Sequence, residues 1–177
     1  MSRAIVLFIN FMLEILAYYQ VKAASSSLLL VYGGSSAFPY VWIGSAVVLL
    51  AFIGVYTRLV ERFSRAQVVV GSLVSFAVLL ALFHWRLQHG GIVSVVIFYI
   101  FVDLFSVVLV EQFWSLANSV TRLEEGHKSY WFIASGGLVG GIAGGLVSSS
   151  LLTYTEMKTL DLLLSCAVLL IVTASVN

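Results

Sequence analysis

Residues 92–119 have the sequence IVSVVIFYIFVDLFSVVLVEQFWSLANS, in which only Asp103 and Glu111 are charged. An α-helix rises about 1.5 Å per residue, so about 20 apolar residues cross the hydrocarbon core of a bilayer. This stretch is longer than that, and its apolar residues lack the period-two alternation of membrane β-strands. It therefore predicts a membrane-spanning helix, and similar runs recur along the chain.

The composition of the whole chain points to the same class. Of its 177 residues, 61% are hydrophobic and 10% are charged, whereas about 25% of the residues of a soluble domain are charged. This argues against a soluble enzyme. The net charge of +1 gives no reason to expect nucleic acid as a partner. Cys166 lies in an apolar stretch and is interpreted as a small buried hydrophobic residue.

Hydropathy and turn residues divide the chain into six predicted spans. They cover residues 4–32, 38–57, 66–85, 92–119, 130–152 and 160–176. The linkers between them are too short for a soluble domain. We therefore expect an all-α transmembrane protein in which residues 1–177 form a single six-helix membrane domain.

The distribution of basic residues predicts the orientation, because cytoplasmic loops carry an excess of Lys and Arg. If the N-terminus is cytoplasmic, that side receives Arg3, Arg58, Arg62, Arg65, Arg122 and Lys128, and the opposite side receives Arg86 and Lys158. Both ends are therefore expected in the cytoplasm, with the protein in a bacterial inner membrane.

Half of that cytoplasmic charge lies between residues 58 and 65, which we predict to be a loop. Its charged residues are Arg58, Glu61, Arg62 and Arg65. One interpretation is a topology anchor. The other is a gate that pairs with a neighbouring helix end, as in the loop between helices two and three of major-facilitator transporters.

Charges in the interiors of the spans are confined to the first and the fourth. The first contains Glu14 and Lys22, and the fourth contains Asp103 and Glu111. At about 100° per residue, each helix gathers its polar residues into one stripe, which also includes Tyr18 on the first helix and Asn118 on the fourth. Charges within a membrane are costly and usually mark a pathway or a partner. We expect the two stripes to face one another or a water-filled cavity.

The predicted depth of each charged residue in the membrane indicates which of them can pair. Lys22 and Asp103 both fall on the outer side of the midplane, so we predict an ion pair between them. Glu14 and Glu111 fall on the inner side. If they approach each other, they resist both being ionised, and one can hold a proton as a coupling site. Alternatively, Glu111 extends to the cytoplasmic interface, and Glu14 pairs with Lys22 or Tyr18.

The fifth predicted span contains two series of glycines at intervals of four residues. The first series is Gly136, Gly140 and Gly144, and the second is Gly137, Gly141 and Gly145. Such spacing lets a second backbone approach closely in lipid. The series predict tight helix packing or, alternatively, a rocking or substrate-facing surface. No lysine follows them as in a phosphate-binding loop.

Other side chains give no sign of catalytic or metal chemistry. His84, His89 and His127 have no carboxylate or cysteine at metal-ligand spacing, so neither a metal nor another cofactor is expected. No combination of nucleophile and base can be assembled, and we expect that the protein is not an enzyme. Trp42, like the other tryptophans, is interpreted as a membrane-interface residue.

The segment EQFWSLAN at 111–118, followed by the glycine series at 136–145, resembles the bacterial branch of the ATP/ADP translocase family. The resemblance covers about residues 15–150. It implies a major-facilitator-like antiporter of nucleotides, with two six-helix halves, alternating access and a cavity lined by helices one and four. It also implies a nucleotide-binding role for Lys22 and a functional carboxylate at Asp103 or Glu111.

Two features of this chain modify what the resemblance implies. Ala23 follows Lys22 where the family often has an acidic residue, and the interior charges sum to −2, which suits a polyanionic nucleotide poorly. The predicted spans make up only one half of such a transporter. The leading hypothesis is therefore a transporter half of three plus three inverted helices, partnered by a second half from the same chain, the same protein or another subunit. The alternative is a non-transporting scaffold subunit of a larger membrane complex.

Overall fold

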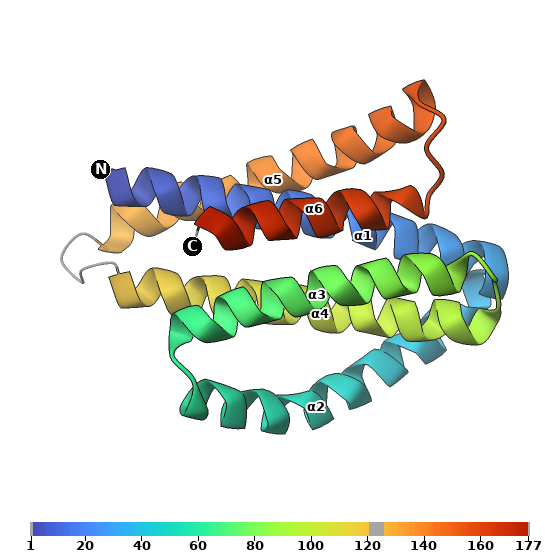
Figure 1. The fold of residues 1–177 in the computed structure, drawn as a ribbon, viewed down its shortest axis with the longest axis horizontal. Helices are drawn as coiled ribbons and strands as arrows, with labels where there is room; N and C mark the ends of the chain where they lie inside the picture. Colours follow the sequence, from blue (N-terminus) through green and yellow to red (C-terminus); the bar gives the residue numbers. More distant parts are fainter. Residues whose placement is uncertain (1, 121–125, 177) are drawn as a thin grey trace.

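The computed structural model describes residues 2–120 and 126–176. These residues form six α-helices and one 3-10 turn, with no β-strand among them. The helices are α1 (Ser2–Gly33), α2 (Phe38–Arg62), α3 (Arg65–Leu87), α4 (Ile92–Val120), α5 (Gly126–Tyr154) and α6 (Asp161–Val176), and the turn η1 is Ser35–Ala37 (Figure 1). The all-helical class predicted from hydropathy is confirmed.

The helices differ in their capacity to cross a membrane. Within the described residues, α1 to α5 each contain a span of sufficient length and hydropathy. α6 has 16 residues, so it is about 24 Å long, shorter than a hydrocarbon core of about 30 Å. It begins only after residues 155–160 (TEMKTL), which form a non-helical connection. The sixth predicted span is therefore a shorter apolar helix.

α1 is the central helix of the bundle. It packs against α4, α5 and α6, while α3 packs against α4 and α6. α2 lies at the edge of the bundle and packs mainly on α4 (Figure 1). α1 starts and α6 ends toward the same end of the bundle (Figure 1). The polar stripe of α1 is thus held within contact distance of α4.

Aromatic side chains fill the interface between α3 and α4. The rings of Phe76 and Phe105 lie 4.9 Å apart edge to face, and those of Phe83 and Phe98 lie 5.2 Å apart. Phe98 and Phe105 are fully buried. Such ring pairs add packing energy beyond the area they bury, so they fix α4 on the side of the bundle that α3 covers.

The turn between α2 and α3 corrects the prediction of a loop at residues 58–65. α2 continues as a helix to Arg62, and α3 begins at Arg65. Ser64 caps α3, because its hydroxyl oxygen accepts a hydrogen bond from the Gln67 amide at 3.4 Å and its own amide donates to Gln67 Oε1 at 3.0 Å. This reciprocal capping lets a new helix start with only two residues between it and the previous one.

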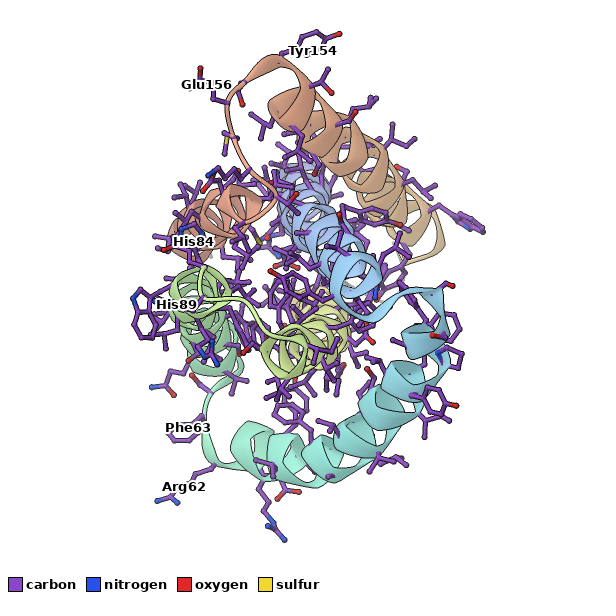
Figure 2. All side chains as sticks on the ribbon, turned by 90° about the vertical axis from the view of Figure 1, so that its right-hand side faces the viewer. Arg62, Phe63, His84, His89, Tyr154 and Glu156 are labelled. Atoms are coloured by element: carbon purple, nitrogen blue, oxygen red, sulfur yellow. The ribbon has the colours of Figure 1, made fainter. Side chains whose placement is uncertain are left out.

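At the opposite end of the bundle, the end of α3 is tied to the segment before α6. His84 Nδ1 lies 3.0 Å from the carbonyl oxygen of Leu160. Figure 2 views this end, with His84 and His89 near the end of α3 and Tyr154 at the end of α5. Gly34 and Gly90 have φ values of 70° and 69°, in the left-handed region that favours glycine, and they make the turns after α1 and α3.

Candidate functional site

The predicted ion pair between α1 and α4 is present in the structure. Lys22 Nζ lies 2.6 Å from Asp103 Oδ1. The side chain of Lys22 is 29% exposed and that of Asp103 is 19% exposed, so the pair is only partly open. Since both residues belong to membrane-spanning helices, each side chain supplies the opposite charge that the other needs there.

Three further side chains complete a polar cluster. The Tyr99 hydroxyl oxygen accepts hydrogen bonds from Lys22 Nζ at 3.2 Å and from Trp42 Nε1 at 3.1 Å. Ser45 Oγ donates to Asp103 Oδ2 at 2.7 Å. Each oxygen of the Asp103 carboxylate therefore has a partner. We call Lys22, Trp42, Ser45, Tyr99 and Asp103 the Lys22–Asp103 cluster.

The cluster also includes a cation–π contact. Lys22 Nζ lies 4.2 Å from the centroid of the Tyr99 ring, close enough for attraction between the ammonium and the ring face. The ring of Phe38 packs edge to face on Tyr99 at 5.9 Å and on Trp42 at 6.1 Å. α1, α2 and α4 therefore meet at one polar site with aromatic walls.

Sequence reasoning identified only part of this cluster. Tyr99 lies one helical turn before Asp103, so its shared face was detectable from the i, i+4 spacing. Ser45 gave no signal, because α2 has no charged residue near it. Trp42 is predicted as a membrane-interface residue. Although its side chain is 57% exposed, its indole nitrogen is hydrogen-bonded within the cluster.

The polar stripe of α1 continues away from the cluster. Tyr18, one turn before Lys22, is half-buried, and its ring contacts Tyr19 at 5.4 Å and Phe105 at 6.4 Å. Ser25 Oγ donates to the Lys22 carbonyl oxygen at 3.0 Å. Tyr18 thus lies next to the cluster along α1.

The structure does not bring Glu14 and Glu111 together. Glu14 is 3% exposed, and its Oε2 has no hydrogen-bond partner among the described residues. Glu111 is exposed. Among the described residues, no hydrogen bond or ion pair joins Glu14 to Lys22 or Tyr18 either, so the alternative prediction for Glu14 is not observed. Glu14 is a buried carboxyl group apart from the cluster.

Asn118 and the basic residues of α2 lie at the surface. Asn118 Oδ1 accepts a hydrogen bond from the Tyr130 hydroxyl at 2.8 Å, which joins α4 to α5. Arg58, Glu61 and Arg62 are exposed on the last turns of α2, with no ion pair among the described residues. The side chain of Arg65 lies outside the described residues, as do those of Arg122 and Lys128.

The two glycine series of α5 have different surroundings. A Cβ at Gly136 would lie 2.5 Å from the carbonyl oxygen of Phe8, and one at Gly144 would lie 2.7 Å from that of Leu16. At Gly140 the clash would be with the Met12 carbonyl oxygen. The α5 backbone therefore lies directly on the α1 backbone along this series.

The second series faces aromatic side chains rather than backbone. A Cβ at Gly137 would meet the Phe11 ring at 2.5 Å, and one at Gly141 would meet the Tyr19 ring at 3.2 Å, while at Gly145 no atom lies within 4 Å. Only the series 136, 140 and 144 thus brings two backbones together. α5 fixes α1, the helix that carries Lys22.

Comparison with known proteins identifies the family of the chain. No curated protein and no solved structure matches it. A family model described as TLC ATP/ADP transporter matches residues 79–176. This region runs from the second half of α3 to the end of α6 and contains Asp103 and Tyr99 of the cluster. Since it is more than half of the chain, the chain belongs to the TLC ATP/ADP transporter family.

Proposed function

We propose that the chain is one six-helix half of a nucleotide transporter that exchanges ATP for ADP by alternating access. The observation that carries this proposal is the Lys22–Asp103 cluster, a partly exposed ion pair within membrane-spanning helices. Ionisable residues at such positions usually mark substrate pathways. The family model adds the class of substrate.

Lys22 is suited to contact a phosphate group. Its ammonium has three N–H donors, of which two point to Asp103 and Tyr99. A phosphate oxygen can take the third, or can replace Asp103 as the ionic partner. Asp103 keeps the hydrogen bond from Ser45 when this happens, so it is not left without a partner. We assign Lys22 to substrate contact and Asp103 to holding Lys22 when no substrate is bound.

The remaining polar residues extend the proposed path. Tyr18 lies one turn from Lys22, and Glu111 and Asn118 are exposed further along α4. Glu14 is buried, with one carboxyl oxygen unpartnered, and is the proposed coupling site. Arg58, Glu61, Arg62 and Arg65 at the α2–α3 junction are proposed as the cytoplasmic gate or topology anchor. With this orientation, the proposal has both termini in the cytoplasm and the protein in a bacterial inner membrane.

The helix pairing supports a three-plus-three inverted repeat of the major-facilitator type. In such a repeat, α1 corresponds to α4, α2 to α5 and α3 to α6. Under this correspondence, the packed pair α1–α5 becomes α4–α2 and the packed pair α1–α6 becomes α4–α3; both resulting pairs are also packed in the structure. The pairs α1–α4 and α3–α6 are unchanged by this correspondence. The set of packed pairs is thus nearly invariant, as two repeats within one six-helix domain require.

A second six-helix half is part of the proposal. α2 is the least covered of the five long helices, and Trp42 extends from the cluster to its exposed side. Lys22 is the sole cationic side chain of the cluster, whereas a nucleotide carries several negative charges. A facing half would close the exposed side and supply further basic residues.

Exchange by the full-length protein in proteoliposomes tests this function. We expect uptake of labelled ATP against internal ADP, slowed at least about tenfold by Lys22→Ala, a loss of about 1.4 kcal/mol of transition-state stabilisation. Lys158→Ala changes an exposed lysine outside the long spans and should leave exchange unchanged. If the intact protein exchanges no nucleotide and purifies with stoichiometric partners, the scaffold hypothesis replaces the transporter.

A further inference from the structure

Trp42 exposes most of its indole ring beside the Lys22–Asp103 cluster. The residue is 57% exposed, yet its Nε1 atom donates a hydrogen bond to the Tyr99 hydroxyl at 3.1 Å. The polar atom of the ring is therefore used inside the protein, and the exposed part is the apolar ring system. A tryptophan of the membrane interface instead keeps its N–H group in the wet head-group region. Trp42 thus has a second feature that the interface interpretation does not explain.

Two contacts fix the orientation of this ring. The hydrogen bond holds its nitrogen on Tyr99, which is 2% exposed. The ring of Phe38, one helical turn earlier on α2, packs edge to face on Trp42 at 6.1 Å. A ring that is held in place before a ligand arrives loses little conformational freedom on binding. The indole is therefore a preorganised apolar surface.

The ammonium of Lys22 lies next to this surface. Lys22 Nζ and Trp42 Nε1 lie 3.2 Å and 3.1 Å from the same Tyr99 oxygen, so the two nitrogen atoms are about 6 Å apart at most. The side chain of Lys22 is 29% exposed, and an exposed charge in contact with lipid tails is costly. Among the described residues, α1 and α2 both pack on α4 rather than on each other. The side shared by Lys22 and Trp42 is therefore suited to a polar path rather than to lipid.

A cation beside an exposed aromatic ring matches the two parts of a nucleotide. The ammonium attracts phosphate oxygens, and an aromatic side chain stacks on a flat heteroaromatic base. In a nucleotide, the base and the first phosphate are separated by one ribose. Of the aromatic rings at the cluster, that of Tyr99 is buried and that of Phe38 is half-buried. Trp42 is therefore the ring with an accessible face.

We infer that the base of the nucleotide stacks on the indole of Trp42 while its phosphates contact Lys22. This inference rests on the proposed function, which supplies the nucleotide, and it adds a substrate-binding residue on α2. Because every base has a π-face, the stacking contributes affinity for nucleotides over phosphates without a base. It does not by itself choose adenine.

Binding of ATP and of inorganic tripolyphosphate to the full-length protein in detergent tests this inference, because tripolyphosphate has the phosphates without the base. We expect Trp42→Leu to weaken ATP binding about tenfold, which corresponds to about 1.4 kcal/mol, and to leave tripolyphosphate binding unchanged. Trp42→Phe keeps an aromatic face without the N–H group and should retain most of the ATP affinity. Trp131→Leu, at a tryptophan of α5 that is 80% exposed, is the matched control and should change neither affinity.

Tryptophan fluorescence gives a second measurement that does not require Trp42→Leu to fold. A base stacked on an indole should quench its emission, so ATP should quench the unaltered protein and tripolyphosphate should not. Trp42→Phe should lose this quenching while it still binds ATP. Trp131→Leu should keep it.

Three results would overturn the inference. Equal weakening of ATP and tripolyphosphate binding by Trp42→Leu would show that Trp42 acts only by holding Tyr99 and Lys22. Equal losses of ATP affinity in Trp42→Phe and Trp42→Leu would assign the effect to the N–H group, and ATP binding that is independent of Trp42 would place the base elsewhere. In each case ATP still binds and the proposed function stands. Failure of the unaltered protein to bind either compound would instead reject the proposed function, and this inference with it.

Discussion

Lys22 and Asp103 are 81 positions apart in the chain, yet their charged atoms lie 2.6 Å apart. The contact joins α1 to α4, and Ser45 brings α2 to the same carboxylate. Nearer the N-terminus of α1, the glycines of α5 lie directly on its backbone at Phe8, Met12 and Leu16. Lys22 is therefore held by its ionic partner, and the helix that carries it is fixed by packing on α5.

Loss of the Asp103 charge should destabilise the protein. Asp103→Asn leaves the Lys22 ammonium in a membrane helix without its carboxylate, which should cost about 1.5–3 kcal/mol, the range for a hydrogen bond to a charged group. Denaturant unfolding in detergent micelles measures this. Glu111→Gln alters an exposed carboxylate on the same helix and serves as the control. Equal unfolding free energies for both variants would contradict the structural role of the pair.

The Tyr99 hydroxyl accepts two hydrogen bonds, and its removal should affect both donors. Tyr99→Phe keeps the ring that faces the Lys22 ammonium but leaves Lys22 Nζ and Trp42 Nε1 without this acceptor. We expect a loss of about 1–3 kcal/mol of stability and a shift in Trp42 fluorescence. Tyr40→Phe, at a tyrosine that is 77% exposed, should change neither quantity.

The glycines of α5 should differ sharply in their tolerance of alanine. Gly140→Ala places a methyl group against the Met12 carbonyl oxygen and must separate α1 from α5, so thermal stability should fall. Gly145→Ala meets no atom within 4 Å and should be neutral or stabilising by about 0.5–1 kcal/mol, because alanine favours the helix. A thermal-shift assay compares the two variants. Similar melting temperatures would contradict the close packing.

Glu14 should tolerate loss of its charge better than loss of its volume. The residue is 3% exposed, and Oε2 has no partner among the described residues. Glu14→Gln preserves the shape and removes the ionisable group, so stability should be kept or raised. Glu14→Ala leaves a cavity and should cost about 2 kcal/mol or more. Greater damage by glutamine than by alanine would show that the carboxylate has an essential ionic partner.

Much of the fold was predictable, because apolar length and turn residues are strong signals in a membrane protein. The Lys22–Asp103 pair followed from helical phase and depth, since both charges need a partner there. Glu111 was not predictable in the same way. It lies eight residues after Asp103, which turns it about 80° around α4, and it is exposed rather than facing Glu14.

The contribution of α2 could not be predicted, for a different reason. Ser45 and Trp42 are uncharged, and many serines and tryptophans in membrane helices have no polar partner in another helix. Only the packing of α2 on α4 shows that Ser45 reaches the Asp103 carboxylate. The predicted loop at 58–65 is wrong for another reason: charged residues do not end α2, which continues to Arg62, and the Ser64 cap then starts α3.

The central claim is that Lys22 and Asp103 act as a unit in the substrate path. The most direct test is a double-mutant cycle on ATP/ADP exchange by the full-length protein, with Lys22→Gln, Asp103→Asn and the double variant. The account predicts that each single change slows exchange and that the double variant is no slower than Lys22→Gln alone, because the two residues share one role. Multiplicative losses, or exchange by Lys22→Gln at the unaltered rate, would contradict it.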